Sequence, residues 1–507
     1  MSQTINQLKE EVRKLKSQIF AMQQNSGFYT YTPQTTEGYN QIAQGKVPYF
    51  VENHDLSITK PHEPITTMIQ GDNLSVLTGL NYVYSGKVDV IYIDPPYNTG
   101  KSIYSYNDKR GTSEDSHSAW LSFMEPRLEL ASNLLINTGV IFVAVGSQEQ
   151  AHLKLLMDKI FGEDNFITTI TVEGVLKNNA KLVSTNNEYW LLYSKDSRAL
   201  KQENPKWRAR KPSAQLLLSK AKEYWEQTFD ASEAQKLLRK YYQTDEAKTV
   251  FANEPGLKMY NRVDENGRIY RAGDLSSPGK AGGSYIVYNP DTGKPVKTPA
   301  RGWANSEKTF NEMVDKGLII WNDESVPAYK RYLDENTEIV LSDIIKKDDR
   351  EHPTKLLQKM LGHNKFTFPK NHLTIAEWVD YVLPASRKTD PVNPPLILDF
   401  FAGSGTTAQA VAHLNQQDAG NRRCILVTAN ENNIPFEITH PRLKAMFTGK
   451  WASGDVSPLR GQLVWLDVNY ASPPGSPPET SWSITGYSQE YMDFISRQKA
   501  WLESKNL

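Results

Sequence analysis

Residues 88–97 read Val-Asp-Val-Ile-Tyr-Ile-Asp-Pro-Pro-Tyr, and this stretch decides the fold. Its first six residues, Val88 to Ile93, are mostly apolar and β-branched, which predicts a buried parallel strand. The polar tetrapeptide Asp94 to Tyr97 therefore stands at the C-terminal end of a strand, where open α/β sheets bind their ligands. Two consecutive prolines fix two φ angles and remove two N–H donors, so the turn is stiff.

The tetrapeptide suits a planar group that carries an amino substituent. The Asp94 carboxylate and a prolyl carbonyl can accept hydrogen bonds from an exocyclic NH2, while the Tyr97 ring stacks on the plane. An ordinary Pro-Pro turn after a strand explains the same residues. The tetrapeptide alone does not decide between these two interpretations.

Composition narrows the class of protein. A chain of 507 residues predicts two or three domains, and 58 Lys and Arg balance 58 Asp and Glu, so any nucleic-acid surface must arise from local clustering. The single cysteine, Cys424, excludes an intramolecular disulfide and a cysteine-built zinc site. The nine histidines are scattered, and we expect no metal site. No membrane-spanning run or signal peptide is evident, which predicts a cytoplasmic protein.

The pattern of strands and helices divides the chain into five segments. Strands and helices alternate over residues 64–194 and again over 346–450, which predicts a parallel, doubly wound α/β sheet. Residues 195–345, which are basic, aromatic and turn-rich, are interpreted as an inserted α+β domain. Residues 1–63 are expected to form an N-terminal helix and an irregular arm, and residues 451–507 a C-terminal tail that ends in a helix at residues 488–503.

Two of these segments contain candidate surfaces for binding partners. Apolar residues within 3–24 repeat every three or four positions, as in a coiled coil, which favours a homodimer over packing on the chain's own domain. In the insert, the basic residues near Trp207 suit contacts to phosphates, although a run of charges is usually a solvated face. These candidate DNA-binding residues are Lys206, Arg208, Arg210 and Lys211.

A second motif lies far downstream. Residues 399–407 read Asp-Phe-Phe-Ala-Gly-Ser-Gly-Thr-Thr, between an expected strand and an expected helix. The spacing of Gly403, Gly405 and Ala408 matches the dinucleotide-binding pattern, and Glu431 follows the next strand, where it can accept ribose hydroxyls. The pattern allows a nicotinamide or flavin dinucleotide as well as S-adenosylmethionine. Its pairing with the proline tetrapeptide favours S-adenosylmethionine, because a carboxylate, rigid carbonyls and a stacking tyrosine serve methyl transfer to an amino nitrogen.

The two motifs together resemble those of the DNA amino-methyltransferases. Their order, with the catalytic motif first, an insert, and the cofactor motif last, resembles the beta-class adenine-N6 enzymes. More narrowly, the chain is similar to the modification (Mod) subunits of type III restriction-modification systems. Supporting stretches include residues 117–124 (His-Ser-Ala-Trp-Leu-Ser-Phe-Met) and 161–166 (Phe-Gly-Glu-Asp-Asn-Phe). The resemblance implies a Rossmann-like methyltransferase fold in circularly permuted order, whose insert recognises the target in double-stranded DNA.

The resemblance also implies roles for individual residues. Asp94 and the Pro95 carbonyl would bind the adenine N6 amino group, Pro96 would stiffen the turn, and Tyr97 would stack on the flipped-out base. The remaining matched positions would bind the cofactor or support its loop. These are Asp72, Lys370, Asp399, Phe401, Gly403, Gly405, Thr406 and Glu431.

Two departures from the family pattern stand at the edge of this site. Asn371 follows Lys370 where the family usually has proline, and Val145-Gly146-Ser147 stands where an Asp pair is common.

Three other functions stay open at this point: a cytosine-N4 methyltransferase, a dinucleotide-dependent oxidoreductase, and a catalytically silent DNA-recognition subunit. The chain has no G-x-x-x-x-G-K-[ST] loop, so a restriction ATPase would lie on a partner subunit.

Overall fold

The structure is a computed structural model, and it describes residues 36–44, 46–98, 113–174, 182–184, 186–204, 206–279, 282–346, 352–388, 390–472 and 489–505. The predicted coiled-coil helix at residues 3–24 lies outside the described residues.

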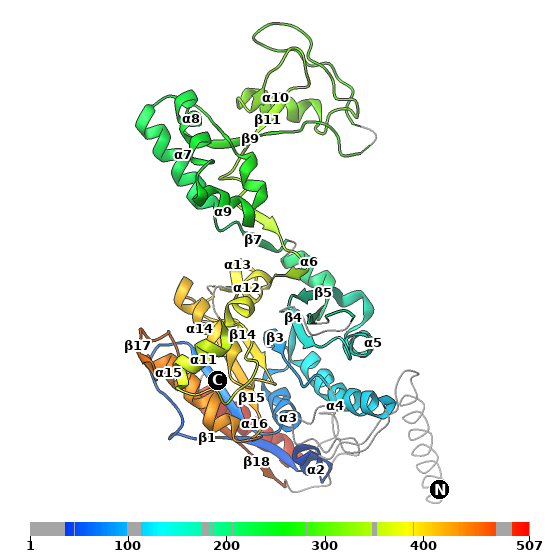
Figure 1. Ribbon diagram of the computed structural model, residues 1–507. Helices are drawn as coiled ribbons and strands as arrows, with labels where there is room; N and C mark the ends of the chain where they lie inside the picture. The colour runs from blue at the N-terminus through cyan, green and yellow to red at the C-terminus, as the bar shows by residue number, and fades with distance from the viewer. Residues whose placement is uncertain are drawn as a thin grey trace, which may run out of the picture. The chain divides into compact units, whose positions relative to one another are not determined.

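Ten of the described strands form one sheet (Figure 1). In spatial order they are β1 (Val47–Glu52), β18 (Gln462–Ala471), β2 (Ile65–Gln70), β15 (Arg423–Thr428), β14 (Leu396–Asp399), β3 (Val88–Ile93), β4 (Leu135–Val145), β6 (Glu188–Ser194), β5 (Phe166–Val172) and β13 (Ile344–Ile345). The strands from β18 to β4 are parallel, as predicted, whereas β6 runs antiparallel to both of its neighbours and β1 runs antiparallel to β18. The sheet is therefore mixed, with a parallel centre.

Helices cover both faces of this sheet (Figure 1). Ile91 and Ile93 of β3 share a core with α3 (Asn73–Tyr84), α4 (Ser113–Leu134) and α5 (Gln150–Phe161). On the opposite face, Phe142 of β4 meets Trp378 of α12 (His372–Val382), with ring centroids 6.0 Å apart. Helix α14 (Thr406–Asp418) packs beside α12, and α15 (His440–Thr448) beside α14. Burial on both faces explains the nearly continuous apolar sequence of β3.

The sheet has a topological switch point between β14 and β3. The chain leaves β14 through α14 to reach β15, and it leaves β3 through α4 to reach β4 on the opposite side. Ile397 pairs with Val90 and Leu398 with Ile91, so the cofactor motif and the proline tetrapeptide emerge at the same edge. Ligands of open α/β sheets bind at such an edge. The doubly wound, Rossmann-like fold predicted from the sequence is confirmed.

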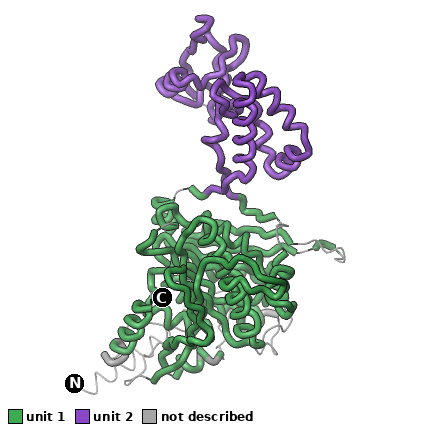
Figure 2. The backbone as a smooth tube through the Cα atoms, turned by 90° about the vertical axis from the view of Figure 1, so that its left-hand side faces the viewer, with its two compact units in different colours: residues 1–207, 342–507 green, residues 208–341 purple. Residues whose placement is uncertain are grey.

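The chain divides into two compact units (Figure 2). Unit 1 comprises residues 1–207 and 342–507, and unit 2 comprises residues 208–341. Within unit 2, β7 (Arg208–Arg210) pairs antiparallel with β12 (Glu338–Val340), so the first and last strands of the unit lie together. The sequence places the insert at 195–345, whereas α6 (Ser197–Glu203) and β13 belong to unit 1.

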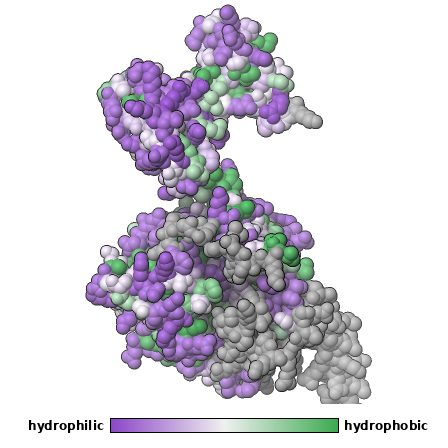
Figure 3. Space-filling view, in the orientation of Figure 1, coloured by the Kyte–Doolittle hydropathy of each residue, from purple (hydrophilic) through white to green (hydrophobic). Residues whose placement is uncertain are grey.

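Unit 2 is itself an α+β structure with two small apolar cores. One core joins α7 (Ala214–Thr228), α8 (Ala231–Tyr241) and α9 (Asp245–Asn253) to strands β8 (Arg262–Val263) and β9 (Ile269–Gly273). The other surrounds Trp303 near α10 (Glu307–Asp315), β10 (Ile319–Ile320) and β11 (Ala328–Tyr332). The surface over α7 and α8 is largely hydrophilic (Figure 3).

Both ends of the chain contribute more structure than the sequence predicts. Within the expected irregular arm, α2 (Glu37–Ala43) is helical and β1 forms an edge of the sheet. Within the expected tail, β18 lies between β1 and β2, whereas α16 (Gln489–Ser504) is the helix predicted at residues 488–503. The sequence does not reveal the strands at the two ends, because β18 mixes polar and apolar residues and its place in the sheet depends on partners distant in sequence. The other described α-helices and strands of unit 1 are α11 (Pro353–Leu361), α13 (Ala385–Lys388), β16 (Lys450–Trp451) and β17 (Gly454–Asp455).

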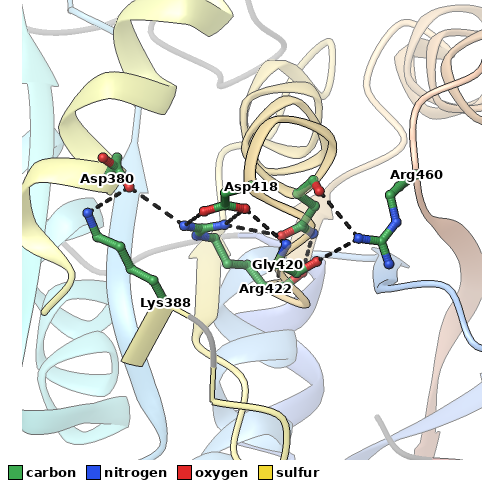
Figure 4. Close-up of polar contacts among 7 residues, drawn as sticks. Asp380, Lys388, Asp418, Gly420, Arg422 and Arg460 are labelled. Carbon is green, nitrogen blue, oxygen red and sulfur yellow. Dashed lines mark hydrogen bonds and ion pairs between the residues drawn. The ribbon is translucent and has the colours of Figure 1, made fainter. Parts of the chain in front are cut away.

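A buried arginine holds the end of α14 against the start of β15 (Figure 4). Arg422, which is completely buried, donates to Asp418 at 2.6 Å and lies 3.6 Å from Asp380. Arg460 donates to the Gly420 carbonyl at 3.4 Å. Because Arg422 directly precedes β15, this network sets where that strand enters the sheet.

Candidate active site

The proline tetrapeptide lies against a lysine from the segment that precedes α12. Lys370 Nζ is 3.2 Å from Asp94 Oδ1 and donates to the Tyr97 hydroxyl at 2.6 Å. The same ammonium group donates to Glu188 at the start of β6. One cation thus joins two carboxylates and a phenol. Glu188 is absent from the residues predicted from the sequence, where its only signal is an acidic residue at the start of an apolar strand.

This cluster contains two acidic side chains and one basic side chain. Burial raises the pKa of Asp94; Lys370 opposes this shift and Glu188 adds to it. Burial alone would lower the pKa of Lys370, but Asp94 and Glu188 together hold it above its ordinary value. With both carboxylates ionised and Lys370 protonated, the cluster carries one net negative charge. Such a site favours a cation, or a nitrogen that becomes positive during reaction.

The two proline carbonyls of the turn differ in their partners. Trp120 Nε1 of α4 donates to the Pro96 carbonyl at 2.7 Å. In the described part of the chain, no hydrogen bond reaches the Pro95 carbonyl. Asp94 and Pro95 therefore supply the acceptors that this turn can offer to an amino group.

Both departures from the family pattern have a local explanation. The Asn371 side chain caps α12 by accepting from the Leu373 amide at 2.9 Å. A Cβ atom at Gly146 would lie 2.9 Å from Gln148 Oε1 and 3.4 Å from Tyr97 Cδ2, so the glycine is packed between the Gln148 side chain and the tyrosine ring.

The glycine turn after β14 is held by a buried carboxylate. Asp399 accepts from the Phe401 amide at 3.0 Å and from the Thr407 hydroxyl at 2.5 Å. Gly403 and Gly405 have φ angles of 47° and 79°, a left-handed conformation that strains any side chain. The turn therefore brings bare backbone to the edge of the sheet, where a cofactor can approach closely.

The other predicted cofactor residues lie along the same edge. Asp72 follows β2 and Glu431 follows β15; β15 lies between β2 and β14 in the sheet. Asp72 also caps α3, accepting from the Leu74 amide at 3.0 Å. The Thr406 hydroxyl accepts from the buried Arg442 at 2.8 Å, so it faces the interior.

Helix α4 connects the two motifs. Arg127 donates to Asn73 Oδ1 at 2.6 Å, and Asn73 in turn donates to the Phe400 carbonyl at 3.1 Å. Phe123, one turn earlier on α4, packs near Phe401, with ring centroids 6.0 Å apart. The helix that donates to the catalytic turn therefore also supports the cofactor turn.

The predicted DNA-binding residues fall on both sides of a unit boundary. Lys206 is exposed in unit 1, whereas Arg208 and Arg210 lie on β7 of unit 2. Lys211 turns inward and donates to the Asn336 carbonyl.

Two further cations gather near Lys211. Burial lowers the pKa of Lys211, and the charges of Arg331 and Arg271 lower it further. The sequence does not reveal this cluster, because its members come from separate strands.

Comparison with known proteins identifies the family. A family model for DNA methylases that act at N6 or N4 matches residues 88–439. The chain belongs to this family. The DNA methyltransferase class predicted from the sequence is confirmed, and the oxidoreductase alternative is wrong.

Individual relatives agree with this assignment. The Mod subunit of the type III restriction-modification enzyme EcoP15I from Escherichia coli is 29% identical over 416 residues, which cover 74% of this chain and 62% of that protein. The type II methyltransferase M.KpnI from Klebsiella pneumoniae is 31% identical over 396 residues, covering 74% of this chain and 83% of that protein. The chain thus spans about three-fifths of the length of the first relative.

Among solved structures, the cytosine-N4-specific PvuII DNA methyltransferase has a TM-score of 0.34 at 10% identity, over 73% of this chain and 86% of that one.

The buried carboxylate of Asp399 generates a prediction about stability. Burial raises its pKa to about 7, whereas an unfolded aspartate titrates near about 3.9. Between these pH values the folded state retains a proton that the unfolded state has released, so stability falls as pH rises. Asp399→Asn removes this titration and keeps an acceptor for the Phe401 amide. We expect the variant to gain stability relative to wild type, by up to about 1.4 kcal/mol per pH unit, until about pH 7.

Urea unfolding at several pH values between about 5 and about 8 measures this difference. Asp418→Asn is the matched control. Burial acts to raise the pKa of Asp418, but Arg422 holds it below its ordinary value, so its titration lies below this range. Parallel stability curves for wild type and Asp399→Asn would contradict the account.

Proposed function

We propose that this chain transfers the methyl group of S-adenosylmethionine to N6 of adenine in double-stranded DNA. The observation that carries the proposal is the pairing of β3 with β14, which brings the proline tetrapeptide and the glycine turn to one edge of the sheet. The names of the relatives, several of which are Mod subunits or type II methyltransferases, support it.

The residues at this edge fit S-adenosylmethionine. Gly403 and Gly405 would let the backbone approach it, and Glu431 would accept its ribose hydroxyls. The hydroxyl of Tyr92 is buried and, within the described residues, unpartnered, and burial and the charge of Asp94 raise its pKa. It is therefore a donor that a ligand can satisfy. When bound, the cofactor supplies an electrophilic methyl on a sulfonium, whose positive charge suits the negative cluster.

The chain's own residues prepare the amino group for attack. Asp94 and the Pro95 carbonyl accept its two hydrogens, which draws electron density back to the nitrogen as it becomes tetrahedral. Lys370 lies 3.2 Å from Asp94 and favours the ionised carboxylate that this role requires. Because N6 takes part in base pairing, the adenine must leave the duplex, and Tyr97 stacks on it. No covalent intermediate with the protein is required.

The nearest rival is a cytosine-N4 methyltransferase, which needs the same chemistry. The Asp before Pro-Pro-Tyr resembles the adenine enzymes, since the cytosine enzymes more often carry Ser there. Product analysis separates the two.

The experiment is transfer of labelled methyl from S-adenosylmethionine to unmethylated genomic DNA, followed by digestion and identification of the modified base. We expect N6-methyladenine from wild type and at least about a 100-fold lower rate from Asp94→Ala, because a transition-state acceptor is lost. Glu503→Ala, which removes a half-exposed carboxylate on α16, is the control and should match wild type.

Calorimetry should show that Asp94→Ala still binds the cofactor. N4-methylcytosine as the product would overturn the proposed substrate, and no transfer by wild type would overturn the proposed activity.

We also propose that unit 2 contacts DNA phosphates. Arg208 and Arg210 lie on β7, and Lys211, Arg271 and Arg331 bring further positive charge together in the same unit. Like charges this close are unfavourable in an isolated protein, and a polyanion relieves that repulsion.

A salt titration tests this contact. Replacing both Arg208 and Arg210 by Gln should weaken binding to a short duplex and lower the slope of log K against log salt by about 2. Fluorescence anisotropy measures the slope. The control replaces Lys222 and Lys236 by Gln, which removes the same charge from α7 and α8, where these lysines lie near Glu226 and Glu233. An unchanged slope in the arginine variant, or an equal fall in the control, would contradict the proposal.

The partners complete the proposal. The relatives named as type III Mod subunits support association with a restriction subunit that carries the ATPase. The heptad pattern of residues 3–24 supports a homodimer and stays a prediction. No helix among the described residues is long and apolar enough to cross a membrane. Because the proposed enzyme acts on DNA, we propose that it works in the cytoplasm, at the nucleoid.

A further inference from the structure

A second cluster of titratable side chains adjoins the catalytic turn. His117 comes from α4, Glu149 directly precedes α5, and His152 lies in its first turn. The potential ligand atoms of these three residues all lie within 4.8 Å of one another. The sequence predicts no metal site, because His117 and His152 belong to separate helices that only the fold brings together.

The carboxylate at the centre of this cluster is only half satisfied. Glu149 is completely buried, and its Oε1 accepts from Asn98 Nδ2 at 2.6 Å and lies 2.6 Å from His117 Nδ1. Its Oε2 has no hydrogen-bond partner in the described part of the chain, and neither does Nδ1 of His152. A buried carboxylate oxygen without a partner costs free energy, so these two atoms indicate a missing group.

The spacing of the two unpartnered atoms suits a shared cation. Glu149 Oε2 and His152 Nδ1 are 3.5 Å apart, with no hydrogen bond between them. Two ligands of a tetrahedral zinc ion, each bonded at about 2.0–2.2 Å, are separated by about this distance. The side chains of His117 and His152 are 33% and 38% exposed, so an ion can enter from solvent and keep a water ligand.

We propose that His117, Glu149 and His152 bind a divalent transition metal of the zinc class. Two imidazoles and one carboxylate favour zinc and its neighbours over magnesium or calcium, which prefer oxygen ligands. The site is a positioning site, because an ion on Oε2 would fix the carboxylate whose other oxygen holds Asn98. That residue directly follows Tyr97 and has a left-handed φ of 50°. The metal thereby stiffens the end of the catalytic turn.

Cobalt(II) is the probe, because its visible absorption reports coordination by nitrogen and oxygen. The full chain, stripped of metal with a chelator, is titrated with cobalt, and zinc is then added as competitor. We expect one equivalent of cobalt to give a visible band that zinc displaces, and zinc to raise the melting temperature of wild type.

Two variants remove different ligands. His152→Ala changes a partly exposed side chain, and Glu149→Gln keeps the shape of the buried one, so both should fold; circular dichroism checks this. Both should lose the cobalt band and the zinc-dependent rise in melting temperature. His54→Ala removes an exposed histidine that lies 3.2 Å from Glu52, and it is the matched control that should retain both. No visible band in wild type, or an unchanged band in His152→Ala, would overturn the proposal.

Discussion

The parallel pairing of β14 with β3 is the contact on which the rest of the site depends. Ile397 and Leu398 lie beside Val90 and Ile91, and this register brings two motifs from opposite ends of the chain to one edge. After β14 the chain turns toward β15, and after β3 it turns the opposite way toward β4. Neither α14 nor α4 therefore crosses the edge between β14 and β3. Helix α4 then braces both turns through Trp120 and Arg127. A change in this register would separate the motifs without altering either one.

The charged and protonated states of the acidic residues determine what the site can bind. Lys370 contacts both Asp94 and Glu188, so a single cation is shared by two carboxylates. In the neighbouring turn, burial raises the pKa of Asp399 to about 7, and its hydrogen bonds shape the backbone. The two aspartates thus have different tasks. Asp94 offers acceptors to a substrate, and Asp399 holds the loop.

The sequence could predict those parts of the site whose conformation is determined by residues adjacent in the chain. The apolar run of β3, the stiff turn after it and the glycine spacing after β14 each depend on neighbouring residues, and they place Asp94, Asp399 and Glu431 at strand ends. Glu188 could not be predicted as a partner of Lys370, because an antiparallel pairing brings it there. The places of Thr406 against Arg442 and of His152 beside Glu149 likewise depend on contacts between elements.

The central claim is that the two motifs form a single site, and a bisubstrate ligand tests it most directly. Such a ligand links the sulfur position of an S-adenosylmethionine analogue to N6 of adenine, and calorimetry compares it with S-adenosylhomocysteine. A single site predicts tighter binding of the linked compound to wild type, with the gain lost in Asp94→Ala because only the adenine half contacts that turn. Equal affinities in wild type, or a gain that survives Asp94→Ala, would contradict the account.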